Sequence, residues 1–368
     1  MLVVFRADAS VQIGTGHVMR CLTLAEQLRQ QGHQCQFICR DHPGHLGELI
    51  EGKGFELHLL AGTAPALANA AEIDNSYAQW LGVTWQQDAR QTLEVLSSLA
   101  ADWLVVDHYA LDARWEKEVA ARVGRIMVID DLADRNHDCA LLLDQNLGSE
   151  AAAYDRKVPD DCIRLIGPQY TLLRPEFARL REGSLERRRH PQLKRILISL
   201  GGVDRTNVTR EVLRALSETS LPSDTELDII MGAAAPYLDE IRSQALHSRF
   251  QATVSVSVSD MAERMCQADL SIGAAGSTSW ERCCLGLPAI LVVLADNQRS
   301  AAHALHEQGV AIVTDSGVGV RDALNQLLAG GSFEERLVAM AHAGAELIDG
   351  MGCHRVVEAL TGSIDGKH

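Results

Sequence analysis

Short apolar runs alternate with longer segments of helical period along almost the whole chain, and this alternation limits the possible folds more than any other feature. Short runs rich in Val, Ile and Leu are typical of parallel strands that are buried on both faces. The runs expected to form strands are residues 2–5, 36–39, 103–107, 125–130, 140–144 and 164–166 in the first half, and 195–200, 226–231, 253–258, 269–272, 289–294 and 310–313 in the second. Segments 207–220, 260–267 and 277–285 lie between such runs and are bounded by turn or capping residues, which indicates helices.

The two similar sets of strands predict an α/β fold of two Rossmann-like, doubly wound domains that face each other across a cleft. The chain has 368 residues, more than the roughly 250–300 at which a single core stops growing, so two domains are expected. The expected parts are an N-terminal domain (1–181), a basic linker (182–194), a C-terminal domain (195–332) and a helical tail (333–368). Segment 62–100, which contains the helix-like stretch 85–99, is expected to elaborate the first domain.

Composition and charge exclude several classes of function. Hydrophobic residues make up 46% and charged residues 23% of the chain, as in soluble globular proteins. The net charge of −15 disfavours a nucleic acid partner, because phosphates require a basic surface. The longest apolar runs, such as 289–295, are far shorter than the about 20 residues that span a bilayer, so no membrane partner is expected. The first residues lack the pattern of a secretory leader, and the scattered cysteines form no CxxC pair, which favours a cytoplasmic protein with buried free thiols.

The residues that follow the first predicted strand are polar and rich in glycine, and ligands of open α/β sheets bind beyond such strand ends. Arg6 and Asp8 come first, and Gly14 and Gly16 then precede a helix that begins near His17. The glycines permit a tight turn and a close approach to a ligand. A helix N-terminus disfavours protonation of an imidazole by roughly 0.3–1 kcal/mol when it is exposed, which favours a neutral ring that can accept a proton. Two interpretations of His17 stay open, a general base or only a helix cap, and the missing third glycine argues against NAD.

The second half places two glycine-rich turns at similar strand ends. Gly201 and Gly202 follow the first strand of this half, where a phosphate-binding turn and a plain glycine turn are both compatible with the sequence. A later strand runs into a small-residue turn and then a helix, so that backbone N–H groups and hydroxyls converge as a diphosphate requires. The residues of this turn are Gly276, Ser277, Thr278 and Ser279. Glu281 lies either near the ribose or in a capping box that begins at Thr278.

Further polar residues follow three other strands. Asn297 and Gln298 open another helix of the second half, with an N-cap as the alternative role of Asn297. Tyr109 follows a strand of the first half, as does the acidic cluster 130–134. Aspartates at strand ends more often cap helices and turns than bind Mg²⁺, so neither a metal nor a cofactor is expected.

Together these segments resemble the hydrolases of the pseudaminic acid pathway, which remove UDP from UDP-2,4-diacetamido-2,4,6-trideoxy-β-L-altropyranose. The resemblance covers about residues 1–308, and the joint occurrence of the motifs is specific, whereas each motif alone is modest. The segments that carry it are Arg6-Ala-Asp8, Ile13-Gly-Thr-Gly-His17-Val-Met-Arg20-Cys-Leu, Val106-Asp-His-Tyr109, Asp130-Asp-Leu-Ala-Asp134-Arg-x-His137, Gly167-Pro-x-Tyr170-x-Leu-Leu-Arg174-Pro-Glu-Phe177, Gly273-Ala-Ala-Gly-Ser-Thr-Ser-Trp-Glu281 and Ala295-Asp-Asn297-Gln298.

The resemblance implies a GT-B fold, similar to that of the glycosyltransferase that adds GlcNAc in peptidoglycan synthesis, with water in place of the acceptor sugar. It implies metal-independent attack of water on the anomeric carbon, C–O cleavage and inversion, with a UDP-sugar as the substrate. By motif, His17 is the expected base, and Tyr109 and Asn297 are expected at the sugar and the reacting water. The turn 276–279 is expected to hold the diphosphate and Glu281 the ribose. Further substrate contacts are expected from Arg6, Asp8, Gly14, Gly16, Arg20, Gly201, Gly202 and Gln298.

Two other classes of function remain open at this stage. A glycosyltransferase would use the same donor and differ only in having an acceptor site. A non-catalytic nucleotide-sugar sensor would bind UDP without turnover. The chain is longer than the compact members of the family, mainly in segment 60–100 and in the tail, and the sequence leaves the oligomeric state open.

Overall fold

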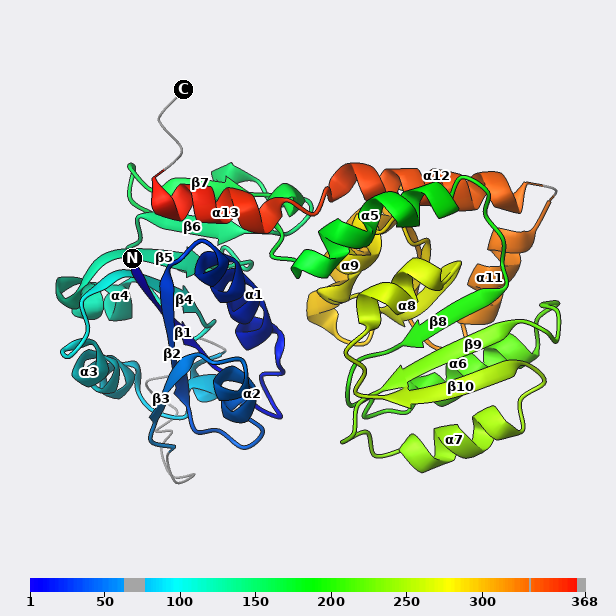
Figure 1. The fold of residues 1–368 in the computed structure, drawn as a ribbon, viewed down its shortest axis with the longest axis horizontal. Helices are drawn as coiled ribbons and strands as arrows, with labels where there is room; N and C mark the ends of the chain where they lie inside the picture. The colour runs from blue at the N-terminus through cyan, green and yellow to red at the C-terminus, as the bar shows by residue number, and fades with distance from the viewer. Residues whose placement is uncertain (63–76, 331, 363–368) are drawn as a thin grey trace. The chain divides into compact units, whose positions relative to one another are not determined.

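A computed structural model describes residues 1–62, 77–330 and 332–362 and divides the chain into two compact units. The first unit combines Met1–Leu172 with the C-terminal segment that begins at Gly352, and the second unit is Leu173–Met351. Each unit is built on one parallel sheet with helices on both faces (Figure 1). The expected fold class of two doubly wound α/β sheets is therefore confirmed.

Within the described residues, the first unit contains a seven-stranded sheet in the order β3-β2-β1-β4-β5-β6-β7, and every neighbouring pair is parallel. The strand order reverses between β1 and β4, the position at which doubly wound sheets bind ligands. The expected runs all form strands, but β3 was not expected, because it is an edge strand in which only Leu60 is fully buried. The strands are β1 (Leu2–Ala7), β2 (Gln34–Arg40), β3 (Glu56–Leu60), β4 (Ala101–Asp107), β5 (Val123–Ile129), β6 (Leu141–Asp144) and β7 (Ile163–Ile166).

Alternate residues of these strands pack on opposite faces of the sheet. Val3 and Phe5 cluster with α1 and α13, whereas Val4 and Leu104 cluster with α3 and α4. Burial of both faces explains why the strands are continuous apolar runs. The helices of this unit are α1 (Gly16–Gln30), α2 (Gly47–Gly52), α3 (Trp85–Leu96), α4 (Ala113–Val119) and α13 (Gly352–Thr361), with 3-10 helices η1 (Ala78–Leu81), η2 (Ala120–Arg122), η3 (Ala151–Tyr154) and η4 (Pro168–Tyr170).

The second unit repeats this plan with a sheet in the order β10-β9-β8-β11-β12-β13, all parallel, whose strand order reverses between β8 and β11. Its strands are β8 (Arg195–Ser199), β9 (Glu226–Met231), β10 (Gln251–Val256), β11 (Leu270–Ala274), β12 (Ala289–Val292) and β13 (Ala311–Thr314). Its helices are α5 (Pro175–Arg187), α6 (Val208–Ser217), α7 (Leu238–Leu246), α8 (Met261–Gln267), α9 (Thr278–Cys284), η5 (Asp296–Gln298), α10 (Arg299–Glu307), α11 (Val320–Leu328) and α12 (Phe333–Leu347).

The expected linker, residues 182–194, is part of the second unit, and its first half is the end of α5. Two of its basic residues, Arg187 and Arg188, hold α5 in place, whereas Arg189 is exposed. Arg187 pairs with Asp269 at 2.5 Å, and Arg188 donates to the carbonyls of Met265 and Ala268. The second unit therefore begins at Leu173 rather than near residue 195, because these contacts fasten the helix to α8.

The C-terminal tail is helical as expected, but its two helices belong to different units. Helix α12 packs with α9 in the second unit, and α13 packs on α1 in the first. The chain turns between them at Gly350, whose φ of +83° favours glycine. A Cβ at Gly352 would collide with the backbone of Thr171. The first residue of α13 can therefore lie this close to Thr171 only if it is glycine. Residues 363–368 of the expected tail lie outside the described part.

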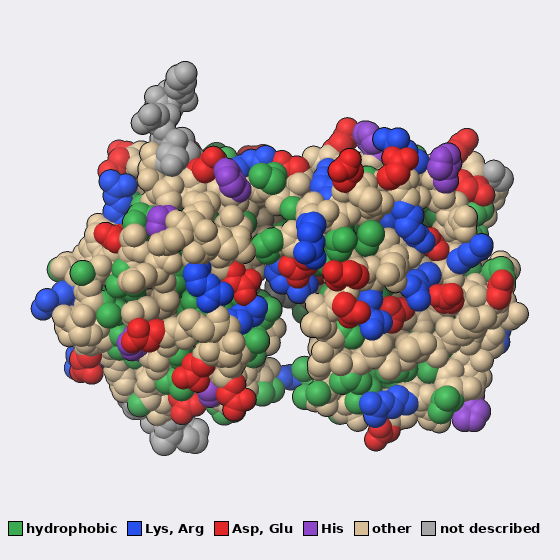
Figure 2. Space-filling model, in the orientation of Figure 1, with side chains coloured by type: hydrophobic (Ala, Val, Ile, Leu, Met, Phe, Trp, Pro, Cys, Tyr) green, Lys and Arg blue, Asp and Glu red, His purple; other side chains and the backbone are tan. Residues whose placement is uncertain are grey.

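The surface carries no extended region of one charge on the face shown in Figure 2, where acidic and basic side chains are interspersed. Among the described residues, no helix combines the length and the apolar composition needed to cross a membrane. The nine cysteines are free thiols, and only Cys266 is not fully buried.

Arg181 is a test of how α5 is held in the second unit. Its guanidinium donates to three carbonyls, those of Cys284, Ala345 and Ile348, and so ties α5 to the ends of α9 and α12. We expect Arg181→Ala to lower the free energy of unfolding by about 2–4 kcal/mol, because hydrogen bonds from a charged group are lost and partly buried carbonyls stay unpaired. Urea denaturation followed by circular dichroism measures this change. Arg179→Ala is the matched control on the same helix, since Arg179 is largely exposed and reaches Glu263 only at 3.7 Å; equal effects of the two substitutions would contradict the assignment.

Candidate active site

His17 lies in the first turn of α1, directly after the exposed turn that contains Gly14 and Gly16. Gly14 has a φ of +85°, a conformation that favours glycine. The imidazole is 8% exposed, and its Nδ1 lies 2.7 Å from Oδ1 of Asp107 at the end of β4. The contact follows from the sheet: β1 and β4 are parallel neighbours in which Ala7 is paired with Asp107, so α1 begins beside the end of β4.

The contact with Asp107 determines which nitrogen of His17 carries the proton. Burial alone raises the pKa of Asp107, but the charge of Arg20 and the hydrogen bonds from Arg20 and His17 outweigh this effect and hold the pKa of Asp107 well below its usual range. A carboxylate only accepts hydrogen bonds, so Nδ1 of His17 is the protonated nitrogen and donates to Asp107. In the tautomer that carries its proton on Nδ1, Nε2 keeps its lone pair and can accept a proton. This is the arrangement of a general base held in one tautomer by an acid.

Arg20 fixes the same carboxylate from the next turn of α1. Its Nε lies 2.6 Å from Oδ2 of Asp107 and its Nη2 lies 2.7 Å from Oδ1, while Nη1 reaches Asp131 at 3.1 Å. The Tyr109 ring stands edge-on to the His17 ring, with 4.7 Å between their centroids. Burial, together with the negative charge of Asp131 and a hydrogen bond to it, raises the pKa of Tyr109, so its hydroxyl stays protonated. The structure thus brings together three of the candidate site residues, His17, Arg20 and Tyr109.

Two aromatic side chains that the sequence analysis missed lie in the same place. Trp80 stacks on Tyr109 at 5.7 Å between centroids, and Tyr77 lies 4.8 Å from Trp80 and 5.0 Å from Tyr109. Both come from the segment that was expected only to elaborate the first domain. Aromatic residues are only 4% of the chain, so two of them three positions apart in a polar segment were the signal available in the sequence.

Arg6 and Asp8 do not face a ligand, which corrects the expectation that they contact substrate. Both are completely buried and form two hydrogen bonds with each other, of 2.6 and 3.0 Å. Asp88 of α3 receives further hydrogen bonds from Arg6, from Arg40 at 2.6 Å and from the indole of Trp115 at 3.0 Å. Since a buried charge is stable only when it is paired, this network holds α3 and the end of β1 together.

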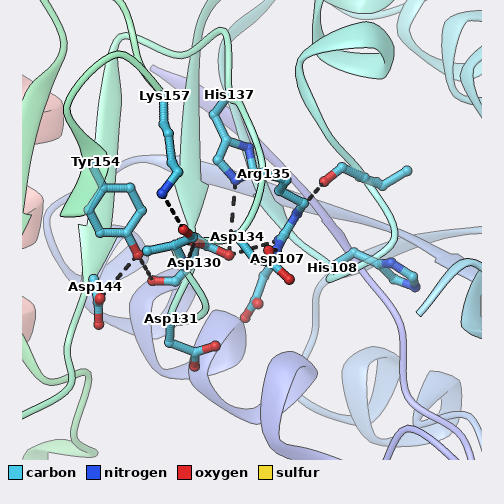
Figure 3. Close-up of polar contacts among 12 residues, drawn as sticks. Asp107, His108, Asp130, Asp131, Asp134, Arg135, His137, Asp144, Tyr154 and Lys157 are labelled. Carbon is cyan, nitrogen blue, oxygen red and sulfur yellow. Dashed lines mark hydrogen bonds and ion pairs between the residues drawn. The ribbon is translucent and has the colours of Figure 1, made fainter. Parts of the chain in front are cut away.

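The acidic cluster after β5 is also engaged within the protein (Figure 3). Asp130 accepts hydrogen bonds from the backbone N–H of Ala133 at 2.9 Å and from the hydroxyl of Tyr154 at 3.0 Å. Arg135 lies 2.8 Å from the other oxygen of Asp130, and Tyr154 also contacts Asp144 at 3.0 Å. Among the described residues, no group of three or more His, Cys, Asp or Glu side chains is arranged to hold a metal ion. The cluster therefore stabilises the strand ends that carry Asp131.

In the second unit the turn between β11 and α9 is partly open. Ser277 is exposed and Gly276 and Thr278 are partly exposed, whereas Ser279 is buried with no hydrogen-bond partner for its hydroxyl among the described residues. A Cβ placed on Gly276 would lie 3.9 Å from Nε2 of Gln298, so the structure brings these two residues together.

A buried arginine, Arg282, was missed by the sequence analysis and lies beneath this turn. Its Nη1 donates to the carbonyl of Ala274 at 3.1 Å, and burial lowers its pKa to about 10, so it stays charged at neutral pH. Gly273 permits this position, because a Cβ there would collide with the Arg282 guanidinium.

Glu281 is not part of a capping box. The N-cap residue of α9, Ser277, makes no side-chain hydrogen bond to the helix, and Glu281 pairs with Arg174 at 3.3 Å. Burial raises the pKa of Glu281, and Arg174 only partly opposes this effect. Arg174 also pairs with Glu176 at 2.9 Å, so the two carboxylates share one guanidinium.

The remaining predicted residues of the second unit lie at the same edge of the sheet. Gly201, with a φ of +93°, and Gly202 are exposed after β8, the neighbour of β11. Asp204 then caps α6 by accepting from the N–H groups of Val208 and Thr209, each at 2.9 Å. Asn297 lies in η5, but its side chain is outside the described part of the structure.

Comparison with known proteins finds a family match within the second unit. Residues 197–349 match the glycosyltransferase family 28 C-terminal domain. The chain is 25% identical over 308 residues to an uncharacterized protein of Methanocaldococcus jannaschii, with 81% of this chain covered, and 29% identical over 199 residues to the spore coat polysaccharide biosynthesis protein SpsG of Bacillus subtilis, with 53% covered. The chain spans 57% of the length of each of these two relatives.

The chain covers almost the full length of a third relative. The chain is 24% identical over 314 residues to the UDP-2,4-diacetamido-2,4,6-trideoxy-β-L-altropyranose hydrolase of Campylobacter jejuni, with 85% of this chain and 98% of that protein covered. The resemblance inferred from the motifs is therefore confirmed.

Solved structures support the fold. The chain matches the crystal structure of MurG from Acinetobacter baumannii with a TM-score of 0.67 at 16% identity, covering 98% of this chain and 99% of that one. It matches the calicheamicin glycosyltransferase CalG4 with a TM-score of 0.61 at 16% identity, covering 99% of each chain. The expected GT-B fold is confirmed.

The buried network around Asp88 predicts a pH-dependent stability. Burial alone raises the pKa of Asp88, but Arg6 and its hydrogen bonds lower it below the ordinary value. We expect Asp88→Asn to cost about 3–5 kcal/mol at pH 7, because buried arginines lose their charged partner. A lowered folded-state pKa contributes stability above the unfolded value of about 3.9 and loses it as the pH falls through the folded value. The difference between wild type and variant should therefore narrow below about pH 4.

Urea unfolding at pH 7 and at successively lower pH measures this difference. Asp41→Asn is the control, since the Asp41 side chain is 60% exposed and should change stability by only about 0.5 kcal/mol or less at either pH. A difference for Asp88→Asn that stays constant down to the lowest measurable pH would contradict the role of the charge.

Proposed function

We propose that the protein is an enzyme of pseudaminic acid biosynthesis that hydrolyses a UDP-linked 2,4-diacetamido-2,4,6-trideoxy sugar to the free sugar and UDP. The observation that carries the proposal is the hydrogen bond between Nδ1 of His17 and the buried Asp107, which leaves Nε2 able to accept a proton. The similarity to the Campylobacter jejuni hydrolase supports the choice of substrate.

In the proposed reaction, Nε2 of His17 removes a proton from water as the water oxygen attacks the anomeric carbon. The bond between that carbon and the diphosphate oxygen breaks, UDP leaves with the electron pair, and the configuration inverts. A positioned base of this kind contributes about 10²–10⁴-fold in rate. Asp107 stabilises the imidazolium that forms, and Tyr109, with its protonated hydroxyl, is the proposed contact to the sugar or the reacting water.

The second unit is proposed to bind UDP. The open turn 276–279 offers backbone N–H groups and hydroxyls to the diphosphate, and the buried cation of Arg282 beneath it favours a negative ligand. Glu281 is proposed to accept hydrogen bonds from the ribose, and Gln298 to contribute an amide beside Gly276. Gly201 and Gly202 are proposed to approach the same ligand from the end of β8, and Asn297 is proposed, from its motif, to contact the sugar or water. Neither a metal nor another cofactor enters the proposed reaction.

A glycosyltransferase is the second candidate. The match of the second unit to the glycosyltransferase family 28 C-terminal domain and the fold shared with MurG favour it. Donor binding and the base would be the same in both reactions, so only the dependence on an acceptor distinguishes them.

An assay without acceptor tests the proposed function. We expect the purified protein to release UDP from the UDP-linked altropyranose in the absence of any acceptor, and His17→Ala to lower kcat by about 10²-fold or more while UDP affinity changes little. Chromatography of the released UDP measures turnover and kcat, and calorimetry measures the affinity for UDP. His342→Ala is the control, because that imidazole is largely exposed on α12. Turnover only with an added acceptor would establish the transferase, and UDP binding without any turnover would indicate a sensor. An unchanged kcat in His17→Ala would leave His17 only a structural partner of Asp107.

The proposed contact of Glu281 with the ribose predicts an effect on nucleotide affinity. Glu281→Gln should weaken UDP binding by about tenfold, because hydrogen bonds to a charged acceptor become neutral ones. Isothermal titration with UDP measures it. Glu176→Gln is the matched control, because Glu176 pairs with the same Arg174 but lies at the start of α5. Equal losses in both variants would mean that Glu281 acts only through its ion pair.

A further inference from the structure

We propose that Trp80 is a sugar-binding residue whose indole packs on the apolar face of the sugar ring and favours a methyl group over a hydroxymethyl group at C6. The proposal rests on the proposed function, because it places the sugar of a nucleotide-sugar beside His17. The proposal goes beyond that function by assigning sugar specificity to a residue of the segment before α3.

Three aromatic rings from two separate parts of the first unit, those of Tyr77, Trp80 and Tyr109, cluster with the imidazole of the proposed base. The Trp80 centroid lies 6.4 Å from that of His17 and 5.7 Å from that of Tyr109, with interplanar angles of 70° and 28°. Tyr77 completes the group at 4.8 Å from Trp80. His17 itself is buried, whereas the other three rings are partly exposed. A core cluster would be sealed from water, so these rings form an aromatic wall at the edge of the sheet where the predicted catalytic groups meet.

The backbone that carries Trp80 is anchored in the core of the first unit. Leu81, the residue after Trp80, is 2% exposed and belongs to the core of the first unit. Gly82 then reverses the chain with a φ of +72°, Thr84 caps α3, and Asp88 of α3 is held by the buried arginines described above. A side chain carried on such a support keeps its orientation before the ligand binds, which lowers the entropic cost of binding.

The chemistry of the wall selects an apolar ligand face. Aromatic rings offer large contact area and few hydrogen-bonding groups, so a sugar hydroxyl packed against them loses water without gaining a partner. A C6 methyl group loses nothing in the same position. An apolar surface distinguishes a methyl from its hydroxylated analogue by about 10–10²-fold. The Campylobacter jejuni hydrolase is named for a 6-deoxy sugar, which fits a ligand of this kind.

The experiment compares two ligands that differ in one oxygen, UDP-N-acetylglucosamine and its 6-deoxy analogue. Binding is measured by isothermal titration on a His17→Asn background, which removes the base and keeps an amide that can bond to Asp107. We expect the 6-deoxy compound to bind about tenfold or more tightly than its hydroxymethyl counterpart. Adding Trp80→Ala should bring this ratio to within about twofold, while Trp80→Phe retains most of it and the affinity for UDP alone stays unchanged.

Trp85→Ala is the matched control, because Trp85 lies five residues further along the same segment and contacts Arg114 instead of the site. It should leave the ratio unchanged. A ratio near one in the background variant, or an equal ratio with and without Trp80, would overturn the proposal. Since binding is measured without turnover, failure of the hydrolytic function appears separately, as absent UDP release by the wild-type protein in the acceptor-free assay.

Discussion

The buried carboxylate of Asp107 is the constraint on which the proposed active site depends. Removing a carboxylate from water is costly, and the charge is stable only if donors compensate it in a fixed geometry. Arg20 supplies two short hydrogen bonds and His17 a third. Both residues lie on one face of the first turns of α1, three positions apart. The same interactions therefore stabilise the charge, fix the start of the helix against the end of β4 and hold the imidazole in one tautomer.

The two sheets place polar turns at corresponding positions. In the first unit the strand order reverses between β1 and β4, where His17 follows β1 and Asp107 is the last residue of β4. In the second unit it reverses between β8 and β11, where the glycine turn at 201–202 and the small-residue turn at 276–279 follow. Adjacent strands with diverging connections leave an edge that no crossover helix covers, so ligands bind there. This common rule explains why the candidate residues occupy the equivalent edge in both units.

The segment before α3 shows how a part of the chain outside the recognised motifs becomes part of the proposed site. Asp88 receives hydrogen bonds from two buried arginines on β1 and β2, and this attachment positions Trp80 and Tyr77 beside Tyr109. The side chains of Arg6 and Asp8 form hydrogen bonds within the same buried network. Residues that resemble ligand-binding groups in sequence thus support the proposed site from beneath, while two aromatic residues outside the motifs lie beside Tyr109.

The sequence by itself determined the fold class and all but one of the strands, because burial on both faces produces apolar runs. It also named His17, Arg20 and Tyr109 as candidate site residues, and the structure places these three side chains in one cluster. It did not reveal β3, an edge strand with little burial, or the place of α13, whose packing on α1 brings together residues more than 300 positions apart. Only the tertiary structure decided that Arg6 and Asp8 are buried, that Arg187 and Arg188 fasten α5 to the second unit, and that Asp107 orients His17. Each of these depends on which charged groups lie within hydrogen-bonding distance of one another, and local sequence patterns carry no information about distances across the fold.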